Sequence, residues 1–246
     1  MALRLYERRC AACHAPFTPT SYTDVPFCPA CLATLLSNPQ PNCRLCGQVL
    51  GTGEAEYCGE CLHTPPPWDG FCMIGPYKGL LRETILQAKF HNDVALLDAL
   101  GHLLANKLLT SGHLPPDRAY CVVPMPVHSD RLRERGFSQC LEIARPLARD
   151  LDLPLMPSLL HKIRATPSQR TLSREERLRN VVKSFAAEPA VSGRHILLLD
   201  DVMSTGATLR HAAASLLEQG AASIFIAVLG RDWLDQKACQ TLSKQL

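Results

Sequence analysis

The sequence lacks a long hydrophobic run. No apolar stretch in its 246 residues approaches the ~20 residues that a membrane-spanning helix needs. Its opening residues, MALRLYERRC, carry charges where a secretory signal peptide needs an apolar core. We therefore expect a cytoplasmic protein without an integral membrane segment.

The sequence also lacks two common nucleotide-phosphate motifs. Neither G-x-x-x-x-G-K-[ST] nor G-x-G-x-x-G occurs, which argues against a Walker loop and a dinucleotide-binding fingerprint. Aromatic residues are scarce at 6%, and the formal net charge is only +3, so charge alone does not indicate a general polyanion binder. The charge is uneven, however. Residues 129–183 hold 12 Lys and Arg against 7 Asp and Glu, so an anionic partner is expected there.

Cysteine is plentiful and regularly spaced. Eight of the 12 cysteines form four Cys-x-x-Cys pairs, separated by 14, 11 and 11 residues. A reducing compartment disfavours disulfides, and two thiolates two residues apart can hold one metal ion from a tight turn. Four such pairs therefore predict two structural zinc ions. The eight ligands are Cys10, Cys13, Cys28, Cys31, Cys43, Cys46, Cys58 and Cys61.

The pairing of these ligands has more than one solution. The simplest is sequential, with the first four cysteines on one ion and the last four on the other, but an interleaved pairing satisfies the same spacing. A site with four sulfur ligands is closed, so the zinc is expected to be structural and not catalytic. The segment contains few large apolar residues, so metal binding must supply much of its folding free energy.

The chain divides at a proline-rich stretch. Residues 1–63 hold the cysteine pairs, and the three prolines over 65–67 cannot continue a helix or a strand ladder. We assign residues 64–79 to a linker and lead-in, and residues 80–246 to an α/β domain.

The second domain alternates helical and strand patterns. Apolar periodicity predicts helices over 80–90, 93–109, 138–151 and 207–219, and short buried strands over 119–123, 195–199 and 223–229. Strands that alternate with helices indicate a parallel sheet covered on both faces.

A ligand-binding turn is predicted after the strand over 195–199. Asp200 and Asp201 follow that strand, at the edge of a parallel sheet where ligands bind. The next turn leads into a helix N-terminus, whose free N–H groups favour an anion. Two carboxylates would repel a phosphate, so we expect them to face the two hydroxyls of a ribose. An acid that only caps the next helix would explain one residue of this set. The phosphate-binding turn is Ser204, Thr205, Gly206, Ala207 and Thr208.

The stretch LLLDDVMSTGATL resembles the phosphoribosyl diphosphate (PRPP) motif of type I phosphoribosyltransferases. Together with the four cysteine pairs, the run VVPMPVHSDRLRERGFSQ and the stretch 164–185, it makes residues from about 10 to 231 similar to the ComF family of bacterial competence-associated proteins. The resemblance implies an α/β fold, with a parallel-sheet type I phosphoribosyltransferase-like domain preceded by a small double zinc-ribbon domain with four cysteine ligands to each ion.

The resemblance also implies roles for individual residues. Asp200 and Asp201 would bind the ribose hydroxyls of PRPP, residues 204–208 its 5-phosphate, and Mg²⁺ would accompany the ligand. Guanidinium groups suit pyrophosphate because their paired donors match paired oxygens. The pyrophosphate-loop candidates are Arg131, Arg135, Ser138 and Gln139, and the mobile-loop candidates are Arg164, Gln169, Arg170, Arg177 and Asn180.

The sequence departs from the family pattern at three points. Ser204 stands where many relatives have threonine, and Ser138 where the family often has asparagine. No separate hood segment, which would recognise the attacking nucleophile, is evident after the strand over 223–229. The sequence also identifies no catalytic residue.

Three functions fit these features. We favour a competence-associated protein that binds PRPP or a related phosphoribosyl ligand and takes part in handling incoming single-stranded DNA in natural transformation. The second is an active phosphoribosyltransferase with an unidentified acceptor. The third is a zinc-ribbon adaptor with a vestigial site that docks a partner such as a competence helicase-like ATPase. The intact acid pair and hydroxyl turn favour ligand binding.

Overall fold

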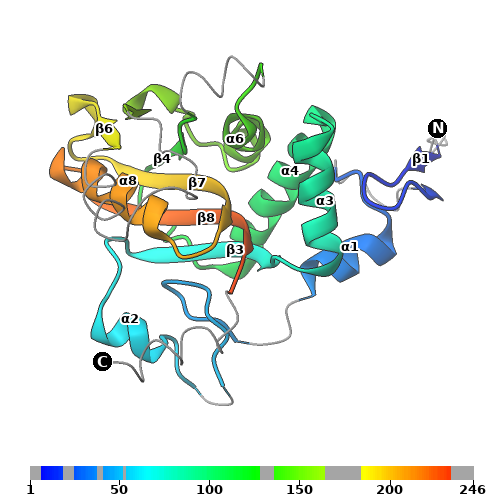
Figure 1. The fold of residues 1–246 in the computed structure, drawn as a ribbon, viewed down its shortest axis with the longest axis horizontal. Helices are drawn as coiled ribbons and strands as arrows, with labels where there is room; N and C mark the ends of the chain where they lie inside the picture. Colours follow the sequence, from blue (N-terminus) through cyan, green and yellow to red (C-terminus); the bar gives the residue numbers. More distant parts are fainter. Residues whose placement is uncertain are drawn as a thin grey trace, which may run out of the picture.

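The computed structural model describes residues 7–18, 25–37, 41–51, 54–127, 136–163 and 184–233 (Figure 1). The helices are α1 (Pro29–Leu36), α2 (Gly59–His63), α3 (Gly79–Phe90), α4 (Val94–Ser111), α6 (Gln139–Asp150) and α8 (Ala207–Glu218), with 3₁₀ turns η1 (Pro157–Leu159) and η2 (Pro189–Val191). The strands are β1 (Arg8–Arg9), β2 (Pro16–Phe17), β3 (Gly70–Pro76), β4 (Tyr120–Pro124), β5 (Leu160–Lys162), β6 (Phe185–Ala187), β7 (His195–Met203) and β8 (Ser223–Arg231).

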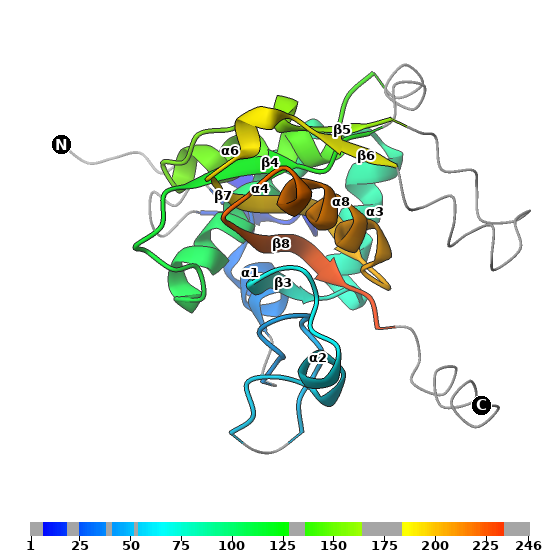
Figure 2. The same cartoon turned by 90° about the vertical axis from the view of Figure 1, so that its left-hand side faces the viewer.

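The core is a four-stranded parallel sheet in the order β3-β8-β7-β4. In its register, Leu197 of β7 pairs with Val122 of β4 and with Phe225 of β8. Residues 196–199 are completely buried, because α8 covers one face of the sheet and α4 and α6 cover the other (Figure 2). The predicted parallel sheet with helices on both faces is confirmed.

The seven predicted elements are confirmed with small shifts in their bounds. The helices appear as α3, α4, α6 and α8, and the strands as β4, β7 and β8. The strand expected to end at residue 199 continues to Met203, because β7 stays paired with β8 as far as Met203 and Arg231. Asp200 and Asp201 therefore lie inside the last part of the strand and not after it, which corrects the sequence-based expectation.

Strand β3 was not predicted, and it lies within the segment that we assigned to a linker and lead-in. The run FCMI is short and is bounded by glycine and proline, which are typical of loops. It forms the edge of the sheet beside β8, where an added Cβ on Gly70 would lie only 2.4 Å from the Phe225 ring. Burial against β8 therefore decides the structure of this segment.

Helices α4 and α6 cross closely at Gly101. A Cβ at this position would lie 2.4 Å from the carbonyl oxygen of Ile143 and 2.5 Å from Pro146 Cγ. The buried His102 beside it bonds through Nδ1 to the Asp150 carboxylate, which joins the same two helices. The crossing therefore depends on a residue without a side chain.

We expect Gly101→Ala to lower the free energy of unfolding by about 1–3 kcal/mol, because the added methyl group overpacks this crossing. Urea unfolding would measure the loss. Gly51→Ala is the matched control, since nothing lies within 4 Å of its added Cβ. Equal stability of the two variants would contradict the close crossing.

The N-terminal region meets the sheet in two separate places. Helix α1 packs against α3 and β3, so the first half of the region lies beyond the end of the sheet. The second half, with α2, lies below β3 in Figures 1 and 2. Within the described part of the chain, no helix combines the length and apolarity needed to cross a membrane.

Candidate functional site

The acid pair lies near the carboxyl edge of the sheet, with its carboxylates oriented by hydrogen bonds. Asp200 Oδ1 accepts the N–H of Asp201 at 2.9 Å and faces the Cys140 thiol at 3.4 Å. Asp201 Oδ1 accepts the N–H of Val202 at 2.6 Å. Each acid thus uses one oxygen to bind the backbone of the next residue, which fixes the direction of the other oxygen.

A lysine from α3 reaches this pair. Lys89 Nζ lies 2.7 Å from Asp201 Oδ2, and both side chains are mostly buried. We did not predict Lys89 as a site residue, because its local pattern is that of any helical lysine and only the fold brings α3 to β7. The ammonium group offsets part of the negative charge of the pair.

Burial and, after it, the nearby charge of Asp201 together raise the pKa of Asp200 to about 7. The hydrogen bonds from the Asp201 N–H and the Cys140 thiol and the charge of Lys89 oppose the shift. A carboxylate whose pKa is raised this far costs folding free energy when it is ionised. The arrangement of the two acids is typical of a site that meets a ligand.

The predicted phosphate-binding turn joins β7 to α8. Gly206 has a φ of 75° and is buried, and α8 begins at the next residue. Thr205 Oγ1 accepts the N–H of Ala207 at 3.3 Å, while the first-turn N–H groups of an α-helix have no acceptor within it. The side chains of the other four turn residues are exposed, namely Ser204, Thr205, Ala207 and Thr208.

We expect Gly206→Ala to destabilise the protein more than Gly193→Ala. Gly206 and Gly193 have left-handed φ angles of 75° and 74°. An alanine at either position should therefore lower the free energy of unfolding by on the order of 1 kcal/mol. Only Gly206 has a close neighbour, because its added Cβ would lie 2.6 Å from Met203 Cε, whereas Gly193 has open space. Chemical denaturation would compare the two losses, and equal losses would contradict a tightly packed turn.

The N-terminus of α6 carries two further predicted residues directly before Cys140, whose thiol contacts Asp200. Ser138 precedes the helix and Gln139 begins it. Gln139 is only 6% exposed, and its Nε2 has no hydrogen-bond partner among the described residues. A buried amide donor without an acceptor is costly, so its position next to Cys140 is that of a group that a ligand would satisfy.

The remaining predicted residues lie outside the described part of the chain. The strands that flank one of these segments, β5 and β6, pair antiparallel with Lys162 opposite Phe185. The described residues on either side of 164–183 therefore lie next to each other. The undescribed candidates are Arg131, Arg135, Arg164, Gln169, Arg170, Arg177 and Asn180.

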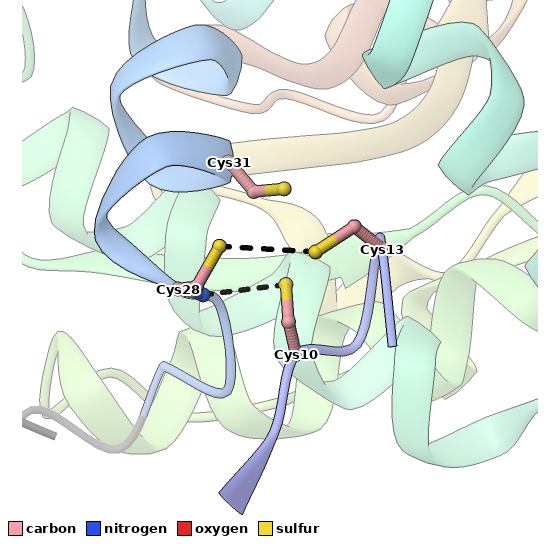
Figure 3. Close-up of side chains that lie close together, drawn as sticks. All are labelled: Cys10, Cys13, Cys28 and Cys31. Carbon is pink, nitrogen blue, oxygen red and sulfur yellow. Dashed lines mark hydrogen bonds between the residues drawn. The ribbon is translucent and has the colours of Figure 1, made fainter. Parts of the chain in front are cut away.

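The structure groups the eight cysteines in the sequential pairing. Figure 3 shows Cys10 and Cys13 on one turn facing Cys28 and Cys31 at the start of α1. The sulfur atoms within each group lie within 4.8 Å of one another. Tetrahedral zinc with Zn–S bonds of about 2.3 Å separates sulfur atoms by about 3.8 Å. Cys13 Sγ and Cys28 Sγ are 3.8 Å apart in the first cluster, and Cys46 Sγ and Cys58 Sγ are 3.6 Å apart in the second, so both groups fit a zinc ion.

One thiol in each cluster is prepared to act as a thiolate. Burial raises the pKa of the Cys10 thiol, but hydrogen bonds from the backbone N–H groups of Cys28, Cys13 and Ala12 outweigh it and lower the pKa to about 6. The Cys46 side-chain hydrogen bond lowers the pKa of Cys43 to about 4. Zinc binds the deprotonated form, which Cys10 and Cys43 reach most readily, whereas burial raises the pKa of Cys31 and Cys61.

These features define a class of protein in which a double zinc ribbon is joined to a phosphoribosyltransferase domain. Residues 2–62 match the double zinc ribbon domain family, and residues 138–244 match the phosphoribosyl transferase domain family. The glutamine PRPP amidotransferase from B. subtilis, solved with ADP and GMP, is 19% identical with a TM-score of 0.37, over 54% of this chain and 25% of that one.

The chain belongs to the ComF family of competence-associated proteins. It is 35% identical to the DNA utilization protein YhgH of Escherichia coli (strain K12), over 77% of this chain and 83% of that protein. It is 30% identical to Competence protein F of Haemophilus influenzae, over 78% of this chain and 85% of the relative. It is 32% identical to Competence protein ComFC of Bacillus subtilis, over 60% of this chain and 58% of that protein.

Proposed function

We propose that this protein binds PRPP, or a related phosphoribosyl compound, at the carboxyl edge of its sheet and takes part in handling incoming single-stranded DNA in natural transformation. It would do so in the cytoplasm. The observation that carries the proposal is an oriented acid pair next to a glycine turn at a helix N-terminus.

Each part of the site would meet one part of the ligand. The turn over 204–208 would accept the 5-phosphate on backbone N–H groups and hydroxyls. The second carboxylate oxygens of Asp200 and Asp201 would accept hydrogen bonds from the ribose 2′ and 3′ hydroxyls, that of Asp201 in exchange for its contact with Lys89. The unpaired amide of Gln139 would donate to an oxygen of the ligand.

Magnesium fits the same set of donors. Mg²⁺ prefers oxygen ligands and is usually bound by one or two carboxylates together with substrate phosphates. Asp200 and Asp201 offer the carboxylates. When bound with PRPP, the ion would neutralise charge on the pyrophosphate group.

The DNA role is supported by the relatives and by charge. Their names refer to DNA utilization and to competence. Residues 129–183 carry the local excess of Lys and Arg, and aromatic residues make up only 6% of the chain. We therefore expect contacts to the DNA backbone to dominate over base stacking, which makes the affinity dependent on salt.

Calorimetric titration of PRPP with Mg²⁺ into the zinc-loaded protein tests the ligand. We expect saturable binding that the Asp200→Asn, Asp201→Asn variant weakens by about 100-fold or more, because it removes two charged acceptors. Glu83→Gln, on an exposed position of α3, is the control for loss of a negative charge elsewhere. Unchanged binding in the double variant would overturn the assignment of the site.

Fluorescence anisotropy with labelled single-stranded DNA tests the partner. Affinity should fall by about tenfold or more between about 50 and 200 mM salt. Failure of the zinc-loaded protein to bind either PRPP or single-stranded DNA would contradict the whole proposal. Pyrophosphate release with an added acceptor would favour an active transferase, and transformation that survives in the double variant would favour an adaptor that docks a helicase-like ATPase.

A further inference from the structure

The second zinc cluster is tied to the sheet by two side chains that bind its first turn. Trp68 Nε1 donates to the carbonyl oxygen of Leu45 at 2.6 Å, and Arg231 Nε donates to that of Cys46 at 3.1 Å. Leu45 lies between the ligands Cys43 and Cys46, and Cys46 is itself a ligand. The two bonds therefore hold the metal-binding turn itself and not a distant part of the ribbon.

The same two side chains also lie against the phosphate-binding turn over 204–208 or Met203 directly before it. Arg231 Nη1 donates to the carbonyl oxygen of Met203 at 3.1 Å, at the end of β7. The Trp68 ring is 5% exposed, and its Cη2 would lie 3.8 Å from a Cβ on Gly206. The guanidinium of Arg210, in the first turn of α8, lies 5.4 Å from the ring centre.

We propose that Trp68 and Arg231 are positioning residues through which the second zinc cluster orders Met203 and the turn over 204–208 that follows it. The inference takes that turn to be the phosphate-binding turn of the proposed function. The first cluster has no such connection among the described residues. It packs through α1 on α3 and β3, and His14 beside it contacts Gln87 at 3.5 Å.

Charge favours the same arrangement. Four thiolates around one Zn²⁺ leave a net charge of about −2 on the cluster. Arg231 carries a positive charge and lies partly buried against that cluster. If the metal-bound turn unfolded, Arg231 would lose the Cys46 carbonyl as an acceptor. Its guanidinium would then be held less firmly in the position from which it donates to Met203.

Hydrogen exchange of the peptide covering 203–211 tests this connection without any ligand. In Arg231→Gln and in Trp68→Phe, which keeps an aromatic ring but loses the Nε1 donor, we expect exchange in this peptide to rise by about tenfold. Zinc content and exchange of residues 195–199 should not change. Arg194→Gln is the matched control, because Arg194 also donates Nε to a carbonyl, that of Ala190, away from the ribbon.

Loss of single zinc ligands gives the second arm. Cys46→Ser should raise exchange over 203–211, whereas Cys13→Ser should not. No increase in Arg231→Gln and Trp68→Phe, or an equal increase over 195–199, would overturn the inference. Failure of PRPP to bind the unmutated protein would overturn the proposed function instead, since the exchange measurement does not involve PRPP.

Discussion

Removal of zinc should unfold the ribbon region while the parallel sheet stays folded. Among the described residues of the ribbon region, seven side chains are buried. Five of these are cysteines, and the other two are the large apolar residues Phe27 and Leu35. Its strands β1 and β2 have two residues each. A core of this kind cannot offset the conformational entropy of folding without metal, and structural zinc supplies on the order of 10 kcal/mol.

The measurement is hydrogen exchange before and after chelation, with zinc content determined in parallel. We expect close to two zinc ions per chain, and complete loss of protection over residues 25–37 and 54–63 in the chelated protein. Protection over 195–199 serves as the internal control, since that strand is buried between helices. A chelated protein whose ribbon keeps its protection would show that the cysteines are ordinary core residues.

Asp200→Asn should stabilise the protein at alkaline pH. The pKa of Asp200 is raised from 3.8 to about 7, chiefly by burial and then by Asp201. The folded state therefore binds more protons than the unfolded state between these two values, and stability falls as pH rises through this window. The contribution is fully present below about pH 4 and lost above about pH 7.

Asparagine does not titrate, so its advantage over the aspartate should grow with pH. From this shift, we expect the difference in unfolding free energy to increase by about 2 kcal/mol between about pH 5.5 and pH 8.5. Urea unfolding at both pH values would measure it, with Asp117→Asn, in an exposed turn before β4, as the control. A difference in unfolding free energy that does not change with pH would contradict the raised pKa of Asp200.

The Asp200→Asn substitution links the stability of the protein to its function. A chain that keeps an acid with this raised pKa near the carboxyl edge of its sheet has a local conflict that folding does not explain. The conflict is resolved if a ligand supplies hydroxyl donors or a cation. The same substitution is therefore expected to stabilise the empty protein and to weaken its binding of PRPP.

Local patterns were sufficient for most of the fold. Strands buried on both faces appear as continuous apolar runs, so residues 196–199 and 224–229 could be recognised directly. The cysteine pairs and the turn at Gly206 were recognisable because their chemistry depends on residues a few positions apart. Strand β3 was missed because only its pairing with β8 distinguishes it from a loop.

The contacts that complete the site could not be read from the sequence. Lys89 meets Asp201 from a helix more than one hundred positions away, and Cys140 meets Asp200 from another. Arg231 joins the turn at Cys46 to the end of β7. Each of these side chains has an ordinary local environment in the sequence, and its partner is set by the way the elements pack.

A crystal structure of the zinc-loaded protein with ribose 5-phosphate and Mg²⁺ would test the site most directly. We predict the phosphate on the backbone N–H groups of the turn over 204–208, and the ribose hydroxyls on Asp200 and Asp201. A sugar phosphate bound elsewhere on the protein, with this turn and the acid pair empty, would contradict the assignment.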